Sequence, residues 1–250
     1  MGVVQGLTEF LPVSSSGHLA LARHLLGAGI AEDVGFEVAV HTGTLIAVLI
    51  YYRKRIISIF TETFSGGEGR RWLIWLVVGT IPAGIAGLAV KDSVAVLFND
   101  LALVGAAWLF TAALLLTAEL FSRVSVPADR MGLARALCIG VAQAVALVPG
   151  ISRSGATISA GLLSGVQRRG SVEFAFILSL PSVGGATLLT LPEWLNGAAA
   201  FGAAHIAGAV AAGVSGYLAI ALMLRVVTGG RLGWFALYCG VLGLGVLLLS

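Results

Sequence analysis

Charged side chains are scarce in this sequence. Of its 250 residues, 15 are Lys or Arg and 12 are Asp or Glu, so only 11% are charged, against about 25% in soluble domains. Apolar residues make up 58% of the chain, above the roughly 45–50% of soluble proteins. This composition excludes an ordinary soluble domain and predicts an integral membrane protein.

Cysteine is scarce as well. Cys138 and Cys239 lie in separate apolar runs, a pattern that predicts neither a disulfide framework nor a cysteine metal site. The net charge of +3 does not indicate nucleic acid, because membrane proteins collect Lys and Arg in their cytoplasmic loops. We therefore expect the bilayer to be a partner of this chain, and no nucleic acid.

Apolar runs of nearly 20 residues recur along the chain, the length that an α-helix needs to cross a hydrocarbon core about 30 Å thick. They predict six membrane-spanning helices: Phe36–Tyr52, Trp72–Val90, Leu101–Leu120, Glu173–Pro192, His205–Leu224 and Trp234–Leu249. The residues between the first three are predicted to be loops. The loop 53–71 is rich in Arg and belongs on the cytoplasmic side, and the loop 91–100 belongs on the outer side.

Two polar segments interrupt this apolar chain. They are Gly2 to Leu21 (GVVQGLTEFLPVSSSGHLAL) and Gly140 to Ser159 (GVAQAVALVPGISRSGATIS). A constant offset without a gap pairs Gln5 with Gln143, Ser14 with Ser152, Ser16 with Ser154 and Gly17 with Gly155. The match predicts two internal repeats, approximately 1–120 and 133–250, within a single membrane domain 1–250.

Each polar segment is too short to cross the bilayer on either side of its proline. We expect two re-entrant hairpins, with turns at 12–17 and 149–155. Three spans separate them, an odd number, so they enter from opposite faces. The prediction is an all-α integral membrane protein with six transmembrane helices and two re-entrant hairpins in an inverted-topology repeat, with the hairpin tips meeting near the midplane.

The second turn has the chemistry of an anion site. Gly-rich turns that open a helix present N–H groups to anions, and Arg153 adds a planar fork that matches phosphate oxygens. The hydroxyls and N–H groups nearby come from Ser152, Ser154, Gly155 and Thr157. This turn is therefore predicted to bind an oxyanion such as phosphate.

The first turn carries groups for acid–base and nucleophilic chemistry. Ser15 needs a base to act as a nucleophile, and His18 lies one helical turn away. Glu9 could orient His18, shuttle a proton or hold a divalent cation, with Gln5 as a neutral oxygen ligand. Ser14 and Ser16 either contact the substrate or cap the returning helix.

Other polar residues have plainer interpretations. For Gln5 and Gln143, amide bonding across the repeat interface competes with metal ligation. His41, in the first span, is interpreted as a helix-packing residue. Small-residue faces such as 208–216 could pair protomers into a homodimer.

QGLTEFLPVSSSGH and PGISRSGAT resemble the two signature motifs of the undecaprenyl-diphosphate phosphatases of bacterial membranes, the BacA type. The likeness covers nearly the whole chain in motif order, length and apolar spacing. It implies removal of one phosphate from a C55 isoprenyl diphosphate, assisted by a divalent cation such as Mg²⁺ or Ca²⁺. The resemblance also implies recycling of the cell-wall lipid carrier in the plasma membrane, with the site open to the outer side.

The site that the resemblance implies agrees with the site predicted from the chemistry of the two turns. The family's motif positions fall on Glu9, Ser15, His18, Arg153 and Ser154, with Ser14, Ser152 and Thr157 as phosphate contacts. At the family's first acidic position, which is Glu or Gln, this chain has Gln5.

A second class of function fits the inverted repeat. Secondary transporters use broken helices that meet at the midplane, so the site could carry an anion or turn over a lipid head group as a flippase. A carrier needs no nucleophile and base, whereas hydrolysis does. The SSSGH turn therefore favours the enzyme.

Overall fold

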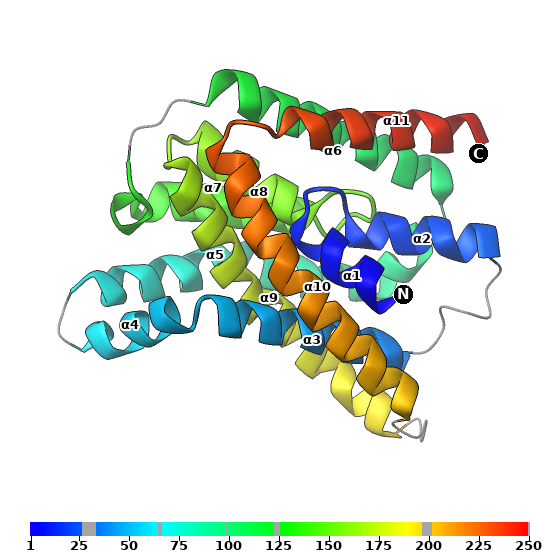
Figure 1. The fold of residues 1–250 in the computed structure, drawn as a ribbon, viewed down its shortest axis with the longest axis horizontal. Helices are drawn as coiled ribbons and strands as arrows, with labels where there is room; N and C mark the ends of the chain where they lie inside the picture. The colour runs from blue at the N-terminus through cyan, green and yellow to red at the C-terminus, as the bar shows by residue number, and fades with distance from the viewer. Residues whose placement is uncertain (27–33, 65–66, 99, 123–125, 197–201, 250) are drawn as a thin grey trace.

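The computed structural model describes residues 1–26, 34–64, 67–98, 100–122, 126–196 and 202–249, and it is built from α-helices (Figure 1). The helices are α1 (Gly2–Phe10), α2 (Ser15–Leu26), α3 (Val34–Tyr51), α4 (Arg53–Thr63), α5 (Glu68–Leu97), α6 (Leu101–Phe121), α7 (Gly132–Val145), α8 (Arg153–Leu163), α9 (Arg168–Asn196), α10 (Ala203–Thr228) and α11 (Gly233–Leu249), with a short 3-10 helix, η2, at Ala128–Arg130. The predicted all-α membrane class is confirmed.

Four of the predicted spans are long apolar helices. These are α5, α6, α9 and α10, each at least 18 residues long and apolar enough to cross a bilayer. The first predicted span is α3, which together with α4 forms a bent pair with an angle of 71° between the two helices. The last span, α11, is apolar but only 17 residues long.

Two predicted loops are helical instead. Residues 53–63 form α4, and α5 continues beyond Val90 to Leu97. Neither segment contains a Gly or Pro that would stop a helix. The α4 helix is further held by Arg55, which pairs with Glu68 and, at 3.0 Å, with Glu173.

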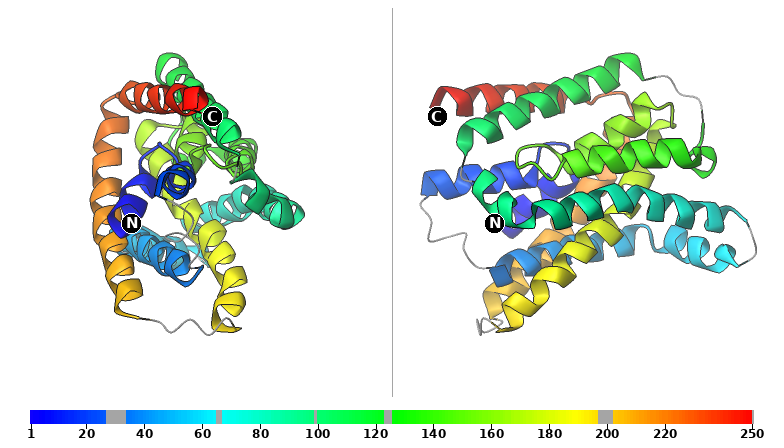
Figure 2. Two further views of the ribbon diagram at one scale, coloured as in Figure 1. Left: turned by 90° about the vertical axis from the view of Figure 1, so that its right-hand side faces the viewer. Right: turned by 180° about the vertical axis from the view of Figure 1, so that it is seen from behind.

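Two pairs of short helices, α1–α2 and α7–α8, form hairpins whose turns are residues 11–14 and 146–152. Figures 1 and 2 show that α2 extends toward one end of the molecule and α7 toward the other, while the two turns lie in the middle. The hairpins thus approach each other from opposite ends.

Each hairpin packs against a long helix from the other half of the chain. The α1 helix lies on α10 and α7 lies on α5, while α6 runs beside α11 (Figure 2). Glycines make both hairpin contacts close: a Cβ on Gly6 would overlap the Ala212 carbonyl oxygen, and one on Gly140 would lie 2.5 Å from the Gly79 carbonyl oxygen. Two related halves are expected to pack on each other in this reciprocal way. The boundaries of the repeats stay a prediction.

The small-residue face of α10 is used inside the chain. A Cβ on Gly208 would meet the Phe36 ring at 2.6 Å, one on Gly213 would meet Gly43, and one on Gly216 would meet the Phe10 ring at 2.8 Å. These glycines of α10 therefore pack against α1 and α3 inside the chain. The homodimer stays a prediction with no face assigned to it.

Candidate functional site

The site is centred on Glu9, near the end of α1. Gln5 and Glu9 are one helical turn apart, and both are buried, with 2% and 8% of their surface exposed. Three groups donate to the carboxylate: Arg153 Nη2 to Oε1 at 2.7 Å, Ser15 Oγ to Oε2 at 2.7 Å, and Gln5 Nε2 to Oε2 at 2.9 Å. A single carboxylate thus joins both hairpins.

Arg153 comes from the first position of α8 and reaches across to α1. Its side chain is 19% exposed and that of Glu9 is 7% exposed. Partly buried, directly hydrogen-bonded pairs of this kind are screened little by water, and loss of one partner is costly because the other charge is left uncompensated. The ion pair between the hairpins is therefore the main electrostatic contact of the site.

Two serines cap the returning helices in the same way. Ser14 Oγ accepts from the N–H of Gly17 at 3.2 Å, and Ser152 Oγ accepts from the N–H of Gly155 at 3.1 Å. A second serine lies beside each cap. The hydroxyl oxygens of Ser14 and Ser16 are 3.1 Å apart, and those of Ser152 and Ser154 are 3.2 Å apart. Because these caps start α2 at Ser15 and α8 at Arg153, both turns lie earlier in the chain than predicted.

Two residues that were predicted to contact phosphate donate hydrogen bonds to backbone carbonyls of the protein. Ser154 Oγ donates to the carbonyl of Leu11 at 3.1 Å, which ties the second turn to the first. Thr157 is buried, and its hydroxyl donates to the Arg153 carbonyl of its own helix at 2.8 Å. Gly155 packs closely, since a Cβ there would lie 3.3 Å from the Pro12 side chain. Ser154 and Gly155 thus join the two hairpins, whereas the bond of Thr157 lies within α8.

The structure gives Ser15 a different partner from the predicted one. The hydroxyl of Ser15 donates to Glu9, whereas His18 is engaged elsewhere through both ring nitrogens. His18 Nδ1 lies 2.7 Å from the Ser14 carbonyl and Nε2 lies 2.8 Å from the hydroxyl of Tyr238. The His18 ring also stacks on Tyr238 and meets Trp108 edge-on. Glu9 is therefore the group placed to accept the Ser15 proton.

Helix α6 holds both turns through residues that sequence reasoning missed. Trp108 Nε1 donates to the Val13 carbonyl at 2.8 Å. Thr111 accepts from the N–H of Ser152 at 3.1 Å and lies 3.2 Å from the Gly150 carbonyl, to which its hydroxyl can donate. The available signal was their position, because both are polar-tipped side chains in the middle of an apolar span rather than at its ends.

Two buried polar atoms next to Glu9 have no hydrogen-bond partner among the described residues. They are Arg153 Nη1, a cationic donor, and Gln5 Oε1, a neutral acceptor. Buried polar atoms without partners are rare and call for an explanation such as a ligand or an ion. The first suits an anion and the second suits a cation or a donor.

The residues at hand fit a divalent cation only in part. Among the residues described, no three His, Cys, Asp or Glu side chains are grouped as metal ligands. Glu9 and the free Gln5 Oε1 are two oxygen donors. Mg²⁺ is often held by one or two carboxylates together with substrate phosphates, so these donors fit a cation that binds with a phosphorylated substrate.

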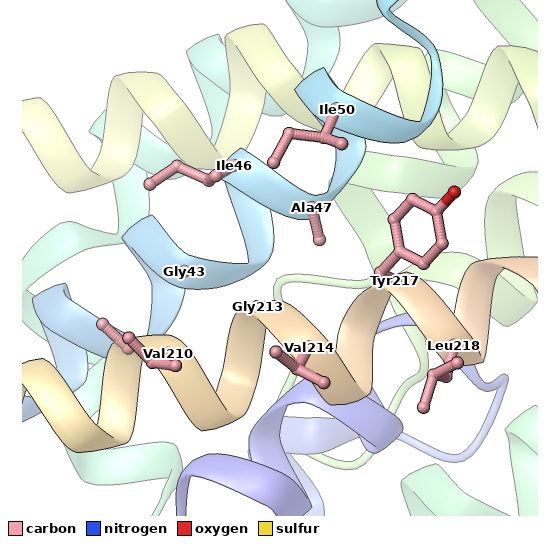
Figure 3. A pocket seen from close by; sticks show the side chains of 10 residues that line it. Gly43, Ile46, Ala47, Ile50, Val210, Gly213, Val214, Tyr217 and Leu218 are labelled. Atoms are coloured by element: carbon pink, nitrogen blue, oxygen red, sulfur yellow. The ribbon is translucent and has the colours of Figure 1, made fainter.

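An apolar groove of about 480 Å³ runs between α3 and α10 (Figure 3). It is lined by small and aliphatic residues with one aromatic: Gly43, Ile46, Ala47, Ile50, Ala209, Val210, Gly213, Val214, Tyr217 and Leu218. None of the described residues that line it carries a charge, so this surface suits hydrocarbon rather than phosphate. The groups that can do chemistry lie at the hairpin turns instead.

Known proteins match this chain over nearly its whole length. The family model described as "Bacitracin resistance protein BacA" matches residues 1–245. A protein named undecaprenyl-diphosphatase from Syntrophotalea carbinolica is 42% identical over 247 residues, which cover 97% of this chain and 94% of the relative. One of the same name from Desulfosudis oleivorans is 42% identical over 259 residues, with 97% and 94% covered. A third, from Methanosphaera stadtmanae, is 36% identical, with 100% and 96% covered.

Proposed function

Because this chain belongs to the BacA family of bacitracin resistance proteins, we propose that it is an undecaprenyl-diphosphate phosphatase. It hydrolyses undecaprenyl diphosphate to the monophosphate and inorganic phosphate, and so recycles the lipid carrier of cell-wall synthesis. The observation that carries the mechanism is the meeting of Ser15, Glu9 and Arg153 across the two hairpins.

Arg153 divides its guanidinium between two tasks in this mechanism. Nη2 holds Glu9, and Nη1 is the buried donor without a partner among the described residues. A guanidinium matches phosphate oxygens well because its N–H groups lie in one plane. We assign Nη1 to the terminal phosphate, with Ser16 at the rim of the first turn as a further hydroxyl contact.

Ser15 attacks the terminal phosphorus in line. As the Ser15 oxygen bonds to phosphorus, the bond to the bridging oxygen breaks, and the Ser15 proton moves to Glu9 Oε2, 2.7 Å away. Glu9 passes this proton to the leaving undecaprenyl phosphate. Water then attacks the phosphoserine, gives a proton to Glu9, and Ser15 regains its proton as phosphate leaves.

His18 acts as a positioning residue in this scheme. Its bonds to the Ser14 carbonyl and to Tyr238 fix the backbone directly before Ser15. With the turn fixed, the Ser15 hydroxyl stays directed at Glu9. Such positioning contributes to the rate because the reacting atoms need no further ordering.

Phosphate release by purified protein in detergent tests the function itself. A preparation without a second compartment leaves nothing to transport, so a transporter or flippase would release no phosphate from undecaprenyl diphosphate. Ser15→Ala separates the covalent route from direct attack by water. We expect this variant to lose both the protein-bound label after rapid quench with substrate labelled in the terminal phosphate and most of its turnover. A variant that kept near-full turnover would reject the covalent route.

A divalent cation, Mg²⁺ or Ca²⁺, is part of the proposal. Glu9 and Gln5 Oε1 would hold it, and it would neutralise charge on the diphosphate oxygens. Removal of divalent cations by chelation is expected to abolish phosphate release, and added Mg²⁺ or Ca²⁺ to restore it. A full rate in excess chelator would exclude the cation.

The chain is a multi-pass membrane protein, and we place it in the bacterial inner (plasma) membrane. The basic segments, α4, the starts of α5 and α9 and the end of α10, lie in the left-hand half of Figure 1. Since cytoplasmic loops are rich in Lys and Arg, we assign this end to the cytoplasm. The α1–α2 hairpin then opens toward the outer, periplasmic side.

A further inference from the structure

His41, on α3, lies beside the α1 residues of the site. Its Nε2 is 3.3 Å from Gln5 Nε2, and its Nδ1 is 2.9 Å from the carbonyl of Glu37. A carbonyl oxygen only accepts hydrogen bonds, so Nδ1 carries the ring proton and Nε2 presents a lone pair. The ring therefore accepts a hydrogen bond from Gln5.

Two acceptors fix the orientation of the Gln5 amide. One hydrogen on Nε2 goes to Glu9 Oε2 at 2.9 Å and the other to His41 Nε2. A rotated amide would bring Oε1 against a carboxylate oxygen and an imidazole lone pair, which repel it. Oε1 is therefore held on the other side of the amide, where it is buried and has no hydrogen-bond partner among the described residues.

The corresponding glutamine of the second polar segment has no such pair of acceptors in the part of the chain that the structure describes. Gln143 lies 3.0 Å from the hydroxyl of Ser182, and that hydroxyl makes its shorter bond, 2.6 Å, to the Leu178 carbonyl. A hydroxyl can both donate and accept, so this contact does not fix the orientation of the Gln143 amide. Glu9 and His41, the two acceptors beside Gln5, are what fix the orientation of its amide.

We propose that His41 is a positioning residue that fixes Gln5 Oε1 as a neutral oxygen ligand for the divalent cation. This inference rests on the proposed function, because the cation belongs to that reaction. It replaces the helix-packing interpretation of His41. A packing role predicts a loss of stability without a change in cation affinity, whereas a positioning role predicts a change in cation affinity.

Three variants separate these roles. His41→Leu removes the acceptor and keeps an apolar side chain in place, and His41→Gln returns an oxygen acceptor near the position of Nε2. Thr42→Val is the matched control on α3, since the Thr42 hydroxyl is bonded to the Val38 carbonyl of its own helix. Binding of Mn²⁺ to the detergent-solubilised protein is followed by electron paramagnetic resonance in the presence of a non-hydrolysable methylene analogue of the diphosphate substrate, because the cation is expected to bind together with a phosphorylated ligand. Phosphate release from undecaprenyl diphosphate is measured beside it.

We expect His41→Leu to weaken Mn²⁺ binding about tenfold, the lower part of the range seen when residues that orient metal ligands are changed. His41→Gln should restore most of the affinity, and Thr42→Val should match the wild type. In a Gln5→Ala background, His41→Leu should cause no further loss.

The inference is overturned if wild-type protein binds no Mn²⁺, if His41→Leu binds it as tightly as the wild type, or if His41→Gln is as weak as His41→Leu. A different result would overturn the proposed function, namely that the wild-type protein binds Mn²⁺ but releases no phosphate from undecaprenyl diphosphate.

Discussion

Glu9→Gln is expected to slow phosphate release from undecaprenyl diphosphate on the order of 10³-fold, within the range for loss of a general base. The amide has nearly the shape of the carboxylate but cannot take the Ser15 proton. It also cannot neutralise Arg153, whose Nη2 lies 2.7 Å from Glu9 Oε1. The measurement is the rate of inorganic phosphate release by purified protein in detergent.

Glu62→Gln serves as the control for this variant. Glu62 lies on α4, where it accepts a hydrogen bond from Ser58, and it has no role in the proposed reaction. The control is expected to keep the wild-type rate. If Glu9→Gln also kept that rate, Glu9 would not be the base.

Arg153→Ala is expected to slow phosphate release by roughly 10³-fold. Loss of one donor to developing charge costs about 10²–10³ in kcat, and the variant also leaves the Glu9 carboxylate buried without its partner. Arg153→Lys should lie between the alanine variant and the wild type. A lysine keeps a positive charge for Glu9 but lacks the second planar N–H group for phosphate.

An exposed arginine provides the comparison for Arg153. The Arg130 side chain is 78% exposed, so Arg130→Ala should leave the rate and the folded fraction unchanged. Arg153→Ala protein that elutes as a folded species and still turns over at the wild-type rate would contradict the assignment of phosphate binding to this residue.

Sequence patterns predicted the main features of the site because the signals were local. Pro12, the serine runs and the glycines mark the turns. The gapless match between the segments at Gly2 and Gly140 predicted that two hairpins would face each other. That arrangement places Glu9 opposite Arg153, and the two side chains lie 2.7 Å apart.

The partner of Ser15 could not be predicted in the same way. A spacing of three residues places Ser15 and His18 near each other on a helix, but it does not decide which acceptor the hydroxyl meets. That choice depends on the turn, which folds Ser15 back onto Glu9, and on Tyr238. Tyr238 is far away in the sequence, so no local pattern could assign it to His18.

The helical structure of residues 53–63, which form α4, was missed for a different reason. The run Arg53–Lys54–Arg55 indicates the side of the membrane on which a segment lies, but it does not indicate whether that segment is helical. The ion pairs of Arg55 with Glu68 and Glu173 are tertiary contacts that hold α4 in place. The charge pattern alone does not reveal such contacts and suggested a loop.

The central claim is that the two hairpins form one reaction centre through Glu9 and Arg153, and a double-variant cycle tests it most directly. Phosphate release is compared among wild type, Glu9→Gln, Arg153→Ala and the combined variant. Residues that act as a unit lose little more together than singly, so the combined variant should be about as slow as the slower single one. A combined loss equal to the product of the two single losses would show that the residues act independently, and it would contradict a shared site.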